Sequence, residues 1–189
     1  MMKHQLRLSP IVGAVVMALA APVAMAAVPA ANSLPGAFYT NNASSDVTYA
    51  PTTTSATNAA TINIGVSTPT VLQWGGSSAT ASAGIAAAKG ITTNAGFDIG
   101  AGATLTISAA SASTPVLVND ITGQPSQIYG GLISSNASLF VANGNGIVVG
   151  SGATITAPSG IALIGYAQSD SAFVGASSPS VLTSDYCQI

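Results

Sequence analysis

Two copies of one short pattern lie 50 residues apart in this chain, and they restrict its fold more than any other feature. Residues 99–106 read IGAGATLT, and residues 149–156 read VGSGATIT. Each copy joins a hydrophobic residue, a G-x-G turn and a strand-forming run, and a repeat at fixed spacing is typical of a solenoid. Two or three coils of about 20–25 residues fit between the copies. The alternative is coincidence in a chain rich in Ala, Thr and Gly.

Short β-branched runs, bounded by Gly, Pro, Asn or Ser, recur from residue 61 onward. Spacings of roughly 8–12 residues between such runs predict an all-β sandwich, barrel or solenoid. The runs are residues 62–64, 71–74, 104–107, 116–118, 127–129, 139–141, 146–149, 154–156 and 161–164. Together with the repeat they favour a parallel β-helix, whose strands pair with the coils above and below while Gly and Asn form the corners. Residues 79–89 are Ala-rich but lack an amphipathic stripe, so this weak helix candidate is interpreted as an insertion.

The first 26 residues have the pattern of a secretory signal peptide. A positive segment with Lys3, His4 and Arg7 precedes the apolar run of residues 11–21, and small residues follow at positions 24 and 26. This pattern predicts cleavage after Ala26, with residues 29–31 as the alternative site, and processing by the general secretion machinery and signal peptidase. A membrane span needs about 20 apolar residues, more than this run contains. We therefore expect the product to leave the cytoplasm.

The chain that remains after cleavage is almost uncharged. Charged residues make up 4% of the sequence, against about 25% in an average domain. Lys89 is the one cation left beside five Asp residues, so the net charge of the side chains is 1 − 5 = −4. This excludes a basic nucleic-acid binder, because nothing would neutralise the phosphates. The lack of His leaves no catalytic triad or His-based zinc site, and no acid cluster suggests calcium. We predict no catalytic residue, metal or cofactor.

Cys187 is the only cysteine and lies two positions before the last residue. It allows no disulfide within the chain. It is interpreted as incidental, with pairing between chains as the alternative.

Four segments resemble, in order, the secretion domain of two-partner secretion exoproteins, the filamentous haemagglutinin and haemolysin-type proteins of Gram-negative bacteria. They are residues 71–74 (VLQW), 97–103 (FDIGAGA), 121–130 (ITGQPSQIYG) and 139–147 (LFVANGNGI), with GSGA following at 150–153. The resemblance extends from residue 71 to about residue 170. Gly144 replaces the family's Pro, which loosens the turn. Residues 77–95 look inserted relative to the family. Family members continue for hundreds of residues, so we expect a fragment, a truncated gene or a stand-alone secretion module.

The resemblance implies a right-handed parallel β-helix that is an export signal rather than an enzyme. In the family, an outer-membrane barrel transporter recognises this domain through its periplasmic domains, and the exoprotein folds at the cell surface. An adhesin of this kind would meet a host or neighbouring-cell surface. The residues that match the recognition motifs are Pro125, Ser126, Gln127, Ile128, Asn143, Gly144, Asn145, Gly146 and Ile147. Turn chemistry alone also explains residues 143–146 as a tight turn, so both roles stay open.

Aromatic and aliphatic residues in the matching segments are expected to form the core rather than a binding platform. They are Trp74, Phe97, Ile99, Tyr129 and Phe140. The predicted organisation is a signal peptide (1–26), a flexible or extended leader (27–60), the secretion domain (61–170), and a C-terminal tail or truncated start of a passenger (171–189).

Two other classes of function remain as alternatives. A self-assembling structural β protein of the surface is compatible with low charge and exposed strand edges. A carbohydrate-active β-helix enzyme would need two acids flanking a cleft. The Asp residues lie among Gly, Ser and Asn, which predicts turn capping instead.

Overall fold

The computed structural model describes residues 26–42, 46–53, 58–76 and 93–175. These residues are mostly β-strand, in agreement with the predicted all-β class. The elements are β1 (Leu34–Pro35), β2 (Phe38–Thr40), β3 (Val47–Thr53), β4 (Asn58–Ile64), β5 (Thr70–Trp74), β6 (Thr93–Asn94), β7 (Ala103–Ala109), β8 (Thr114–Asp120), β9 (Ser126–Ile128), β10 (Gly131–Ser135), β11 (Ala137–Asn143), β12 (Ile147–Val149), β13 (Thr154–Thr156), β14 (Ile161–Ile164) and α2 (Asp170–Gly175). The predicted signal peptide up to residue 25, the weak helix candidate at 79–89 and Cys187 lie outside the described residues.

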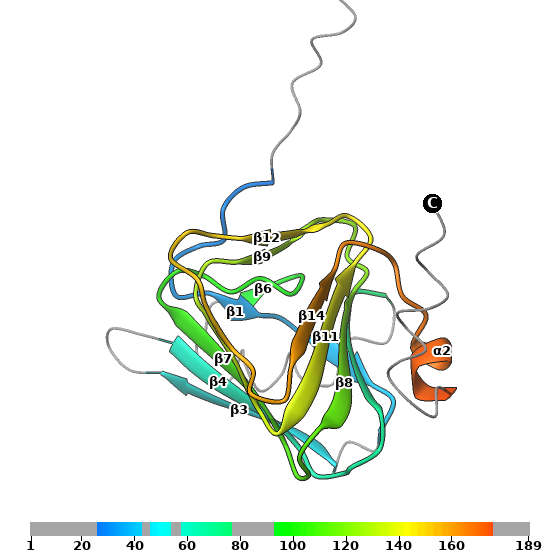
Figure 1. Ribbon diagram of the computed structural model, residues 1–189. Helices are drawn as coiled ribbons and strands as arrows, with labels where there is room; N and C mark the ends of the chain where they lie inside the picture. The colour runs from blue at the N-terminus through cyan, green and yellow to red at the C-terminus, as the bar shows by residue number, and fades with distance from the viewer. Residues whose placement is uncertain (1–25, 43–45, 54–57, 77–92, 176–189) are drawn as a thin grey trace, which may run out of the picture.

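The strands form three faces around one core (Figure 1). One sheet has the order β13-β10-β7-β4-β3 and a second the order β14-β11-β8-β5-β2. The third face holds the β12-β9 pair, which the bridge between Ile99 and Ile128 extends, and β1 pairs with β6. From β7 onward, every third strand returns to the same sheet and runs parallel to its predecessor. Both five-stranded sheets are nevertheless mixed.

The antiparallel strands come from the segment predicted to be a leader. β2 pairs antiparallel with β5, and β3 pairs antiparallel with β4. Leu34, Phe38 and Tyr49 are buried in the same core cluster as Trp74. The described residues between 27 and 60 are thus part of the folded unit, and the predicted boundary at residue 60 does not separate them from the residues that follow. The strands of this segment are not copies of the repeat, so periodicity does not reveal them.

The two copies of the sequence repeat occupy equivalent positions two steps apart. Leu105 pairs with Leu132, and Leu132 pairs with Ile155. Ala103 N donates to Gly100 O at 2.9 Å, and Ala153 N donates to Gly150 O at 3.0 Å, so both G-x-G turns close alike. The strand between them, β10, follows Tyr129-Gly130 directly and lacks the G-x-G spacing. The middle copy is therefore present in space but not recognisable in the sequence.

The core consists of side chains that stack in columns across the strands. Trp74, Phe97 and Ile99 are fully buried. The indole of Trp74 donates from Nε1 to Gly36 O at 2.9 Å, and its ring centroid lies 4.9 Å from that of Phe97. Tyr129 and Phe140 are only partly buried. Strand alternation places Phe140 on the opposite side from its neighbour Leu139, which is in the main core.

A second, smaller apolar cluster lies between α2 and the sheet that contains β5, β8 and β11. Phe173 of α2 is buried with Val71, Leu117 and Ala142, and its ring centroid lies 5.8 Å from that of Phe140. Asn119 Nδ2 donates to Gln168 O at 3.1 Å and to Asp170 Oδ1 at 2.6 Å. The chain therefore stays attached past residue 170, where the sequence predicts a separate tail. Within the described residues, no helix is long and apolar enough to cross a membrane.

Candidate functional site

The two segments that match the recognition motifs, residues 125–128 and 143–147, lie against each other. β9 and β12 pair in parallel, with Ile147 opposite Ser126 and Val149 opposite Ile128. Ser126 N also donates to Gly146 O at 3.1 Å. The third face of the molecule thus brings together residues that are about 20 positions apart in the chain.

Asn143 holds the turn that follows β11. Its side chain is fully buried, and Nδ2 donates to Gln124 O at 2.8 Å and to Ser126 Oγ at 2.9 Å. Asn143 Oδ1 accepts from Asn145 N at 2.7 Å, and Gly146 N donates to Asn143 O at 3.0 Å. Gly146 has a φ of 98°, a backbone conformation that residues with a side chain rarely adopt. Both polar atoms of the Asn143 amide are therefore used to shape the tight turn.

Asp120 joins this turn to the rest of the corner. It ends β8, directly opposite Asn143 in the ladder, and is 2% exposed. Oδ1 accepts from Thr122 N at 3.0 Å and from Thr122 Oγ1 at 2.6 Å. Oδ2 accepts from Phe97 N at 2.9 Å and from Ser126 Oγ at 2.7 Å. Four donors thus compensate the loss of hydration of the buried carboxylate. We call Asp120, Thr122, Ser126 and Asn143 the Asp120 corner.

Sequence reasoning did not assign this role to Asp120, which it treated with the other Asp residues as a turn-capping group. The available signal was the pair Asn119-Asp120 at the end of the apolar run of residues 116–118. Polar residues that finish a buried strand need partners at its end. Which partners they find depends on segments far away in the chain.

Asp98 and Gln127 extend the corner toward the start of the described chain. Asp98 Oδ1 accepts from Gln127 N at 2.7 Å, and Gln127 Nε2 donates to Ala27 O at 2.8 Å. Burial raises the pKa of Asp98; the hydrogen bond from Gln127 opposes this shift, and the nearby Asp120 adds to it. The described residues contain no Lys, Arg or His to neutralise these two carboxylates.

The predicted recognition residues divide into buried and exposed sets. Ser126, Gln127, Ile128 and Asn143 are buried, Pro125, Gly146 and Ile147 are partly buried, and Gly144 and Asn145 are exposed. Ile121 and Val148, at the rim of the same corner, are 47% and 40% exposed. A partner can therefore touch the turn and its apolar rim, while the buried set determines their shape.

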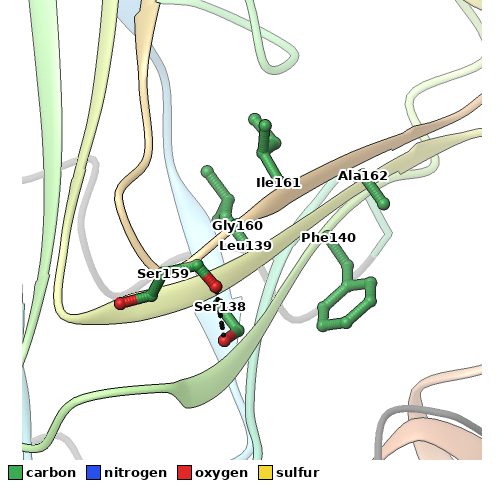
Figure 2. A pocket seen from close by; sticks show the side chains of 7 residues that line it. All are labelled: Ser138, Leu139, Phe140, Ser159, Gly160, Ile161 and Ala162. Carbon is green, nitrogen blue, oxygen red and sulfur yellow. Dashed lines mark hydrogen bonds between the residues drawn. The ribbon is translucent and has the colours of Figure 1, made fainter.

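A separate hollow of about 280 Å³ lies beside β11 and β14 (Figure 2). Its lining consists of residues 138–140 and 159–162, among which Ser138 Oγ donates to Ser159 O at 3.1 Å. None of these lining residues carries a charge, so this hollow offers no acid or base. The described residues also contain no group of three side chains able to ligate a metal ion.

The chain matches no protein-family model and no curated protein.

Proposed function

We propose that this chain is a secretion domain of the two-partner type, from a filamentous-haemagglutinin-like surface adhesin. In this proposal an outer-membrane barrel transporter recognises the domain in the periplasm and exports it. The observation that carries the proposal is the meeting of residues 125–128 with residues 143–147 at the Asp120 corner. The two segments were singled out separately by resemblance, and a shared recognition surface requires them to be adjacent.

The fold that we propose is a right-handed parallel β-helix. Three observations support the parallel winding: the return of every third strand to the same sheet, the parallel register from β4 to β14, and the equivalent positions of the two repeat copies. A β-helix of this kind also suits export, because its strands pair mainly with their neighbouring turns and folding can propagate from one turn to the next.

In this proposal, the buried residues of the corner fix its shape and the exposed residues contact the transporter. The side chains of Asp120 and Asn143 form hydrogen bonds with other groups of this chain, and these bonds hold the turn in one conformation. Gly144 and Asn145 then meet the transporter at the surface, beside the apolar side chains of Ile121 and Val148. A partner strand can add main-chain hydrogen bonds at such a place, with apolar side chains setting the register.

Export is the experiment that tests the proposal. The full chain, with a C-terminal tag, is expressed in a Gram-negative host with and without the outer-membrane transporter encoded nearest to its gene. We expect the tag in the medium only when the transporter is present. Retention in the periplasm in both strains would contradict the proposal.

A pair of exposed substitutions separates recognition from folding. Asn145→Ala is expected to lower the amount released at least about fivefold, which corresponds to about 1 kcal/mol of binding free energy, with unchanged thermal stability. Ser151→Ala, also at an exposed turn but outside the predicted recognition residues 125–128 and 143–147, is the matched control and should be released like the wild type. Equal release of the two variants would remove residues 143–147 from the recognition surface.

A further inference from the structure

The last turn of the molecule leaves its core columns uncovered. Ile99 and Ile128 are fully buried, but Val149, which follows them in the same column, is 46% exposed. Val118 and Val141 are likewise fully buried, whereas Leu163 above them is 42% exposed. Figure 2 shows Leu139 and Ile161 pointing to one side of the β11–β14 pair and Phe140 to the other. The apolar interior therefore reaches the surface at this end.

The strand edges at the same end are unprotected. β12, β13 and β14 are each the last strand of their sheet, and no described strand pairs with their outer edges. Exposed edges are usually guarded by charged residues, especially Lys, because unpaired strand edges tend to associate. Residues 146–164, which form this turn, contain no charged residue. We call β12, β13 and β14 with their uncovered side chains the open end.

The chain that follows β14 does not cover the open end within the described residues. After Ile164 it passes to the outer face of the sheet, where Asn119 binds Gln168 O and Asp170. Phe173 then packs against Val71 of β5 and Leu117 of β8, which lie three and two places from β14 in the sheet order. Residues 165–175 thus run back along the molecule and away from the exposed edge.

We propose that the open end is an interface with a second copy of this chain, the two copies meeting end to end about a two-fold axis. The axis reverses the chain direction, so β14 pairs antiparallel with β14 of the second copy. A two-fold interface places each surface against itself, and an uncharged edge permits this at no electrostatic cost. Inward residues must face inward residues for the cores to join, so Leu163 lies opposite Leu163 or Ile161 of the second copy.

Sedimentation of the processed product of the full chain tests this interface, and it needs no transporter. We expect a dimer at about 100 µM protein, a concentration that fills an interface of micromolar Kd. Leu163→Lys places like charges across the two-fold axis and should weaken the dimer at least about tenfold. Val174→Lys, at a side chain 40% exposed on α2, is the matched control and should dimerise like the wild type.

Mixing two variants distinguishes this arrangement from other contacts. Leu163→Lys and Leu163→Glu are each expected to be monomeric alone, and their mixture should form heterodimers because opposite charges then meet across the interface. A monomeric wild type at about 100 µM would overturn the proposal. So would protection, in the monomer, of those amides of β12, β13 and β14 that point away from β9, β10 and β11, because it would show that the chain covers its own outer edge.

Discussion

The two ends of the strand stack differ in how they finish. At one end, β2 and β3 reverse direction, and Phe38 and Tyr49 cover the core beside Trp74. At the other end, β12, β13 and β14 keep the parallel direction, and Val149 and Leu163 remain nearly half exposed. A parallel ladder offers the same unpaired edge after every turn, so it has no natural stop. At one end only, the antiparallel strands β2 and β3 terminate the parallel ladder.

The largest contrast is expected between one inward-facing side chain of each end. Trp74→Ala removes a fully buried ring and should lower the free energy of unfolding by about 3–5 kcal/mol. Leu163→Ala should cost only about 1 kcal/mol, because much of that side chain already meets water. Urea denaturation at a protein concentration below dimer formation measures both. Equal losses would mean that the open end is covered.

Two glycines extend this contrast to the backbone. A Cβ at Gly130 would collide with the carbonyl oxygens of Gly100 and Ala103, whereas a Cβ at Gly152, in the last turn, would meet nothing within 4 Å. Gly130→Ala should therefore destabilise the protein by about 3 kcal/mol. Gly152→Ala should be neutral or stabilise it by about 0.5 kcal/mol through the unfolded state. Thermal denaturation of the two variants measures this difference. Equal melting temperatures would contradict the prediction.

Tyr49 is the weak point of the covered end. Its hydroxyl is buried without a hydrogen-bond partner among the described residues, and burial raises its pKa to about 12. Tyr49→Phe should stabilise the protein by about 1 kcal/mol at neutral pH, since it removes an unpaired polar group. The folded state holds the phenolic proton more tightly than the unfolded state, so the wild type should also lose stability as the pH rises above 10. Denaturation at pH 7 and pH 11 checks both effects, and a less stable Tyr49→Phe variant at pH 7 would reveal a partner for the hydroxyl.

The smallest expected effect concerns the Asp120 corner, between the two ends. Because burial raises the pKa of Asp98, the folded state binds this proton more tightly than the unfolded state. The contribution of Asp98 to stability therefore falls as the pH rises through the window between 3.8, its ordinary pKa, and the higher folded value. Asp98→Asn keeps an acceptor for Gln127 N and should flatten the pH dependence there. Denaturation from pH 4 to 7 measures how the free energy of unfolding changes with pH. If the variant and the wild type change alike, a group other than Asp98 causes the pH dependence.

Local sequence patterns predicted the strands well. Each of the nine β-branched runs overlaps a strand of the structure, and residues 154–156 and 161–164 coincide with β13 and β14. β10 was missed because Gly130-Gly131 replaces the G-x-G turn of the flanking copies. β2 and β3 were missed because the segment that contains them, residues 27–60, is rich in Ala, Thr, Asn and Pro and looks like a loop. These strands exist because β5 and β4 offer them edges, which is information that a local pattern does not contain.

The sequence by itself determined the positions of nine strands, the scarcity of charge, the turn at residues 143–146 and the equivalence of the two repeat copies. These properties follow from residue type and short-range spacing. Only the tertiary structure decided that Asp120 ties Phe97 to Ser126 and thereby to the Asn143 turn, and that one end is covered while the other is open. Hydrogen bonds and strand pairing between different turns of the chain depend on how the turns stack, and stacking is a property of the whole chain.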